Sequence, residues 1–167
     1  MKKLILFFAV LLISTATFAQ KKPARSVPQQ AAAEAKPLTD DEAIKKIIGK
    51  EAVMFYKKDF NGWAATWWQE DYVYWACVEK EGNKFQKGWP DLSSYIQDYI
   101  TQNPKPMKVK MTRENWNVKM YEDKAMVTFD QTKLEGTTSI TTKESRFLEK
   151  RTGEWKMTYM VGIPTFM

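Results

Sequence analysis

The stretch KDFNGWAATWWQEDYVYWACVE, residues 58–79, decides the fold, because its pattern changes partway from helical spacing to alternation. Trp63 and Trp67 are four residues apart, the spacing that puts two side chains on one face of a helix. From Tyr72 to Glu79 successive side chains alternate between two faces, as in a strand. The aromatic rings are therefore distributed over at least three surfaces, which argues against a single sugar-binding platform.

The residues before this stretch predict a long amphipathic helix. Thr39 and Glu42 have the spacing of a capping box, and apolar side chains then recur at helical intervals. We therefore expect a helix over residues 40–57. A second, shorter helix is expected to follow the break at residues 59–62 and to run through Trp67.

The residues after this stretch predict a third helix and four more strands. Pro90 suits the first turn of a helix that ends at Asn103. In the strand that follows, the apolar positions change phase, which predicts a bulge near residues 112–115. The four segments that alternate like strands are Met107 to Tyr121, Lys124 to Glu135, Thr138 to Lys150 and Glu154 to Ile163.

This order of elements indicates an α+β domain. We expect three N-terminal helices packed on a strongly bent antiparallel sheet, because helices segregated from a run of strands must cover one face of that sheet. Residues 38–167 are long enough to form one such domain with its own core.

The N-terminal residues predict export. Residues 1–20 combine two lysines, a short apolar stretch and small residues, which is the pattern of a signal peptide. Cleavage near Ala19 or Gln20 is expected to leave a secreted or periplasmic protein without a membrane span. Residues 21–37 contain prolines, small residues and scattered charge, and they are typical of a flexible tether.

The composition argues against several classes of function. The chain has no histidine and one cysteine, Cys77, which excludes His-dependent triads and an intrachain disulfide. We expect no metal site and no cofactor. The formal net charge is +6, but six basic side chains and one acidic side chain precede residue 37, which leaves +1 for residues 37–167. We therefore expect no nucleic-acid partner.

Three groups of residues carry a family resemblance. They are KDFNGW with EDYVY (residues 58–63 and 70–74), KGW (residues 87–89), and KESRFLEK with GEWKM (residues 143–150 and 153–157). In these segments the chain resembles the NTF2-like superfamily, and within it the SnoaL-like or DUF4440-type domains. The resemblance implies a cone, in which a bent sheet and three helices enclose a pocket, and it implies dimerisation through the outer sheet face. It implies no single function, since enzymes and non-catalytic binding domains share this cone.

The best candidate site residues are Glu144 and Arg146, which are two apart on a predicted strand and therefore point to the same side. Glu144 lies near the position of the second, oxyanion-binding acid of ketosteroid isomerases. The general base of those enzymes corresponds to Ala76, so their mechanism does not transfer directly. Glu144 is a candidate general acid or base, and Arg146 a candidate anchor for an anionic ligand. The alternative is a structural ion pair at the wall of the cone.

Aromatic side chains supply the other candidate pocket residues, and the alternative for each is a place in the core. These functions remain open: an exported protein that binds a small, mostly apolar ligand, an isomerase, dehydratase or cyclase that uses Glu144, and a dimeric interaction module of the cell envelope. The candidate ligand-binding residues, with Arg146, are Tyr56, Trp63, Trp67, Tyr74, Trp89, Tyr95, Trp116 and Tyr159.

Overall fold

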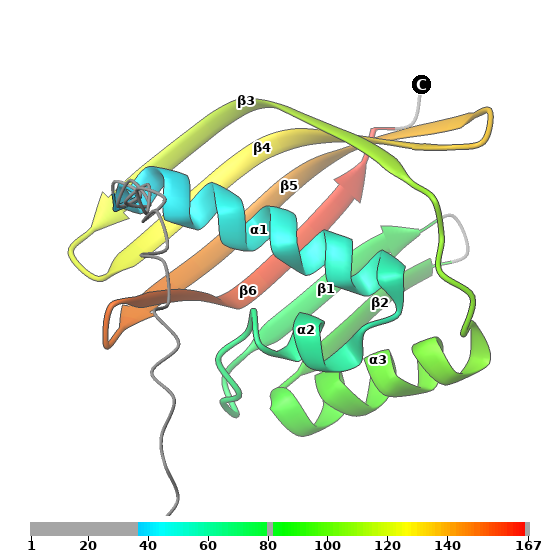
Figure 1. Ribbon diagram of the computed structural model, residues 1–167, viewed down its shortest axis with the longest axis horizontal. Coiled ribbons are helices and arrows are strands. Elements are labelled where there is room, and N and C mark those ends of the chain that lie inside the picture. The colour runs from blue at the N-terminus through cyan, green and yellow to red at the C-terminus, as the bar shows by residue number, and fades with distance from the viewer. Residues whose placement is uncertain (1–36, 80–81, 166–167) are drawn as a thin grey trace, which may run out of the picture. The chain divides into compact units, whose positions relative to one another are not determined.

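The computed structural model describes residues 37–79 and 82–165, which form three helices and a six-stranded sheet (Figure 1). The α+β class is confirmed. The predicted signal peptide and nearly all of the predicted tether lie outside the described residues. The elements are α1 (Asp40–Lys57), α2 (Phe60–Ala64), β1 (Tyr74–Glu79), β2 (Gly82–Lys87), α3 (Trp89–Gln102), β3 (Lys110–Tyr121), β4 (Lys124–Glu135), β5 (Thr138–Arg151) and β6 (Glu154–Pro164).

The first helix has the predicted bounds and the predicted cap. The backbone N–H of Glu42 donates to the Thr39 hydroxyl at 3.3 Å, and the backbone N–H of Thr39 donates to the Glu42 carboxylate at 2.8 Å. Two N–H groups that have no partner within the helix are thereby satisfied. The helix ends at Lys57, and the next residue, Lys58, caps it in a left-handed conformation with a φ of 64°.

The second helix is shorter than predicted, because it ends at Ala64 and does not reach Trp67. The chain beyond it pairs with β6 instead. The Met157 N–H donates to the Thr66 carbonyl at 3.0 Å, and the Trp68 N–H donates to the Met157 carbonyl at 3.0 Å. These bonds to a distant strand replace the intrahelical bonds of a further turn.

The sheet has the order β2-β1-β6-β5-β4-β3. Strands β3 to β6 form the predicted four-stranded antiparallel meander. The predicted bulge is confirmed, since the β3–β4 register shifts between Glu114 and Asn117 and Asn115 has a φ of 55°. This irregularity lets β3 bend with the curved sheet.

Two expectations about the arrangement are corrected. The sheet is not wholly antiparallel, because β1 pairs parallel to β6. The three helices are not all N-terminal to the sheet, because α3 follows the β1–β2 hairpin. Strand β2 was not predicted, since GNKFQK has one apolar side chain and no alternating pattern, and it forms an edge of the sheet.

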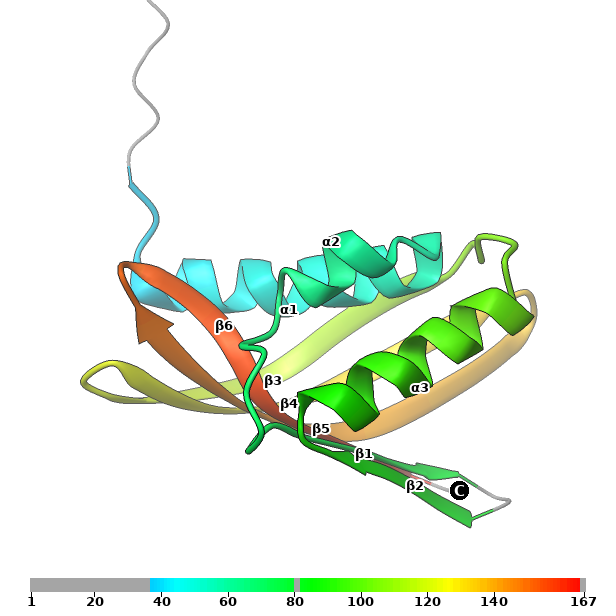
Figure 2. The same ribbon diagram turned by 90° about the horizontal axis from the view of Figure 1, so that it is seen from below.

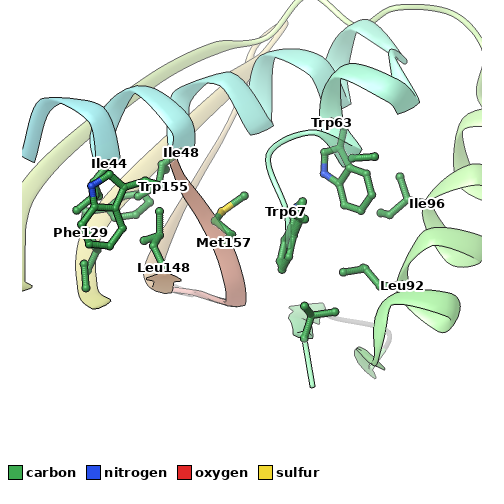
Figure 3. Close-up of a cluster of buried hydrophobic side chains, with 14 residues drawn as sticks. Ile44, Ile48, Trp63, Trp67, Leu92, Ile96, Phe129, Leu148, Trp155 and Met157 are labelled. Atoms are coloured by element: carbon green, nitrogen blue, oxygen red, sulfur yellow. The ribbon is translucent and has the colours of Figure 1, made fainter. Parts of the chain in front are cut away.

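The helices lie on one face of the sheet, which we call the inner face (Figure 2). Core side chains from α1 meet those of β4 to β6, and a second group, around Trp63, Trp67 and Ile96, lies between α2 and α3 (Figure 3). Both indoles of this second group are almost completely buried. Among the described residues, no helix has the length and hydrophobicity to span a membrane.

Candidate functional site

The inner face changes from apolar to polar along β4 and β5. Alternate residues of a strand face the same side, so Phe129 and Gln131 on β4, and Glu144 and Arg146 on β5, all point inward. Leu148, the next inward residue of β5, belongs to the hydrophobic core. The polar side chains therefore extend the core layer toward one end of the sheet.

Glu144 and Arg146 form a buried ion pair. The Glu144 carboxylate and the Arg146 Nη1 are 2.6 Å apart, and the two side chains are only 4% and 2% exposed. The other carboxylate oxygen accepts from the Thr142 hydroxyl at 2.5 Å and from the Gln131 amide at 3.2 Å. Glu144 is thus held by three donors, as a buried carboxylate requires.

Arg146 is less completely satisfied than its partner. Its Nη1 also donates to the carbonyls of Ser145 at 3.0 Å and Val161 at 3.4 Å. Its Nε is buried and has no hydrogen-bond partner in the part of the chain that the structure describes. A buried N–H without an acceptor costs free energy, so an acceptor atom supplied by a ligand or a water molecule would stabilise it. The Lys58 Nζ and the Trp67 Nε1 have the same status among the described residues.

Gln131 connects this pair to a second guanidinium. The Arg113 Nε donates to the side-chain amide oxygen of Gln131 at 2.8 Å. The Arg113 Nη2 lies 3.4 Å from the Met111 sulfur, which is a weak acceptor. The Cζ atoms of Arg146 and Arg113 lie 5.5 and 6.0 Å from the centroid of the Phe129 ring. Both cations therefore converge on one aromatic ring.

Helix α1 adds a carboxyl group to the same region. Glu51 is only 6% exposed and accepts a hydrogen bond from the Trp63 indole at 2.8 Å. Burial raises the pKa of Glu51, and the nearby charge of Arg146 opposes this rise in part. The raised pKa favours the neutral, protonated form. We call Glu51, Arg113, Gln131, Thr142, Glu144 and Arg146 the inner polar cluster.

One side of the inner polar cluster is open to solvent. Arg113, Gln131 and Thr142 are partly buried rather than buried. Tyr56, from the end of α1, is also partly buried, and burial raises the pKa of its hydroxyl. Burial lowers the pKa of Arg113, but a guanidinium remains charged in water at neutral pH. Solvent therefore reaches the cluster at these side chains, whereas Glu144 and Arg146 lie behind them.

Several predicted pocket residues lie in the core. Trp63 packs against Trp67 with ring centroids 5.9 Å apart and stacks on Trp89 at 5.8 Å. Of these three, Trp63 contacts the inner polar cluster, through Glu51. Trp116 stacks on Phe129 at 4.3 Å and packs against the core.

The remaining predicted tyrosines are divided between the two faces. Tyr95 of α3 packs on Trp75 with ring centroids 5.3 Å apart, on the inner side. Tyr74 stacks on Tyr159 at 5.6 Å, and Tyr159 is 38% exposed. Because Tyr74 and Tyr159 are paired neighbours on the outer face, they lie apart from the inner polar cluster.

The structure adds cluster members that the sequence-based candidates lacked, above all Glu51 and Arg113. A signal for Glu51 exists in the sequence: it lies three residues after Ile48 and seven after Ile44, on the apolar stripe of α1. Arg113 is two residues after Met111 on β3, so both side chains point to the same face of the strand. This alternation alone does not show whether that face is buried in the core or exposed to solvent.

A hollow of about 580 Å³ lies over β3 to β6, and most of its lining residues face outward, although Phe129 and Glu144 also line it. The outward-facing residues include Asn117, Thr128, Ser145 and Tyr159. The hollow is open and its Asp130 is already paired with Lys143 at 2.7 Å. We place the candidate site at the inner polar cluster because the cluster's charges are buried and incompletely paired. Within the described residues, no group of acidic or cysteine side chains has a metal-binding arrangement.

The fold is similar to those of several solved structures. An NTF-2-like protein of unknown function from Shewanella oneidensis is 16% identical, with 75% of this chain and 99% of that chain covered and a TM-score of 0.58. The CaMKII hub of S. rosetta is 18% identical over 78% and 100% of the two chains, with a TM-score of 0.59. A proposed ketosteroid isomerase from Parabacteroides distasonis is 12% identical over 76% and 89%, with a TM-score of 0.60.

These likenesses establish the fold: the chain has the NTF2-like fold, as the sequence resemblance implied. No family model and no curated protein matches the sequence. The proteins that share the fold range from a hub domain to a proposed isomerase, so the function must be argued from the site.

Proposed function

We propose that this chain is an exported protein that binds a small, mostly apolar molecule on the inner face of its sheet, against the inner polar cluster. The observation that carries the proposal is the buried Glu144–Arg146 pair with an unsatisfied Arg146 Nε beside solvent-reachable Arg113. Buried ion pairs contribute little net stability, because desolvation offsets their attraction. A binding role supplies a reason to keep them.

The surroundings of the cluster support an apolar ligand body. Phe129 lies beneath both guanidiniums, and the partly buried Tyr56 lies near Glu51 and Glu144. Binding sites for small molecules combine such apolar walls with a few convergent polar groups. The ligand would lie against the aromatic side chains with its polar end at the guanidiniums.

A ligand screen tests this proposal. The purified protein would be screened with a panel of small aromatic and aliphatic acids, amides and alcohols, by thermal shift and then by calorimetry. We expect at least one class to raise the melting temperature and Arg113→Gln to reduce that effect. Lys119→Gln removes an exposed positive charge from the same strand and serves as the matched control. A panel without any binder would count against the proposal.

A second candidate function is enzymatic proton transfer, as in isomerisation, dehydration or cyclisation. The observation that favours it is a pair of buried carboxyl groups in different environments: Glu51 has a raised pKa, whereas Glu144 is paired with Arg146. Such pairs separate acid and base roles. If an activity is identified, Glu144→Gln and Glu51→Gln should each lower kcat by about 100-fold or more; an unchanged kcat in both variants would exclude this mechanism.

Two further proposals concern relatives and partners. A SnoaL-like or DUF4440-type relationship within the NTF2-like fold stays a prediction.

Homodimerisation through the outer face is supported by exposed apolar side chains there, including Tyr159 and Met126. Sedimentation equilibrium at micromolar concentration checks it, and a monomer would leave the interaction-module function with little support.

A further inference from the structure

We infer that the ligand of the inner polar cluster carries a carboxylate, and that Arg113 and Arg146 bind this group together. The inference rests on the proposed function and names its ligand class. It depends on three properties of the cluster, namely its charge, its unused hydrogen-bond donors and the position of its two guanidiniums.

The charges of the cluster do not balance. Arg146 has a carboxylate partner in Glu144, at 2.6 Å. Within residues 37–79 and 82–165 Arg113 forms no ion pair, and its contacts are an amide oxygen and a thioether sulfur. Glu51 is shifted toward its neutral form by burial. In the neutral form of Glu51 the cluster has two guanidiniums and one carboxylate, an arrangement that suits a singly charged anion.

The hydrogen-bond donors of the cluster are also incompletely used. No described residue accepts a hydrogen bond from the Arg146 Nε, and the Arg146 side chain is only 2% exposed. The Arg113 Nη2 donates to sulfur, which accepts weakly. A carboxylate has two oxygens in one plane, and charge-assisted bonds from guanidinium groups to these oxygens are short and strong.

The two guanidiniums that carry these donors lie near the same glutamine and the same aromatic ring. Gln131 bonds to both Arg113 and Glu144, so a continuous set of hydrogen bonds links the two guanidiniums. Both guanidiniums also lie within 6.0 Å of the Phe129 ring centroid. The apolar part of the ligand would then contact the ring-lined part of the inner face, while its carboxylate accepts from the two arginines.

The test uses matched pairs of compounds that differ in charge but hardly in shape. Phenylacetate, hexanoate and cyclohexanecarboxylate would each be compared with the corresponding amide, by calorimetry at pH 7. We expect at least one carboxylate to bind ten times more tightly than its amide, or better. Arg113→Gln should remove this preference, whereas Lys119→Gln should leave it unchanged.

Arg113 is the first residue to test because its side chain is partly buried. The second variant is Arg113→Lys, which keeps the positive charge but removes the planar set of guanidinium donors. Circular dichroism would confirm that each variant is folded. Equal binding of acids and amides would overturn the carboxylate inference and leave the proposed inner-face site standing. Binding of inorganic phosphate without any carboxylate would overturn it as well, and an absence of all binding would overturn both proposals.

Discussion

The two ends of the inner face use the same strands and differ in what they bury. At one end Ile44 and Ile48 of α1 belong to the same hydrophobic cluster as Val127 and Leu148. At the other end the same helix contributes Glu51, near Glu144 and Arg146 of β5. Local pattern decides which way a side chain points. Whether that side chain then lies in the hydrophobic core or in the polar cluster depends on the helix that covers it.

The two ends also differ in their effect on stability. Each buried aliphatic side chain of the apolar end contributes roughly 1.5–3 kcal/mol relative to an exposed one. The polar end buries three ionisable groups, Glu51, Glu144 and Arg146, and leaves the Arg146 Nε without a partner among the described residues, which stabilises little or nothing. Three predictions test this difference, and they are given in order of expected size.

The largest effect is expected from breaking the buried ion pair. Glu144→Leu should destabilise the protein by about 3–5 kcal/mol, because it leaves Arg146 buried without its carboxylate. Adding Arg146→Met should recover most of that loss, since two apolar side chains need no pairing. Urea denaturation followed by circular dichroism measures both variants. A double variant as unstable as the single one would mean that the ion pair itself stabilises the fold.

The apolar end should respond as an ordinary core. Leu148→Ala should cost about 3 kcal/mol, because Leu148 is completely buried and its removal leaves a cavity. Leu134→Ala is the matched control, with a leucine that is 38% exposed, and it should change stability by less than about 1 kcal/mol. Denaturant midpoints give both values. Equal losses in the two variants would contradict the assigned core.

The smallest effect is expected at Glu51 and depends on pH. Because burial raises its pKa in the folded state, the folded chain holds this proton more tightly than the unfolded chain does. The free energy of unfolding should therefore fall as pH rises above about 4.5, by at most about 1.4 kcal/mol per pH unit for one proton. Glu51→Gln cannot ionise, and its amide oxygen can still accept from Trp63.

The measurement is the difference in stability between Glu51→Gln and the native protein at pH 4, 6 and 8. We expect this difference to grow in favour of the variant as pH rises. Taking the difference between the two proteins cancels the titration of the other acids, which both proteins share. A difference that is constant with pH would show that Glu51 does not have a raised pKa.

Much of the fold follows from local sequence. The capping box and apolar spacing predicted α1 with the observed bounds, and alternation predicted the four strands of the meander. The phase change in β3 predicted its bulge. These signals work because helix caps, helical faces and strand faces depend on residues only a few positions apart.

The candidate site was predicted only in part. Spacing put Glu144 and Arg146 on one side of a strand, and the structure adds Glu51 from α1 and Arg113 from β3. The sequence also suggested Tyr74 and Tyr159 as pocket walls, and they stack on the outer face. The alternation of side chains assigns the residues of each strand to two faces, but it does not show which face the helices cover.

The sequence by itself determined the class of the domain, most of its helices and strands, and the absence of histidine chemistry. Only the tertiary structure decided that β1 runs parallel beside β6, that α2 ends at Ala64, and that Glu51 lies near Arg146. The physical reason is distance along the chain. Strand pairing, burial and the pKa of Glu51 arise between residues that are tens of positions apart, and no local pattern encodes such contacts.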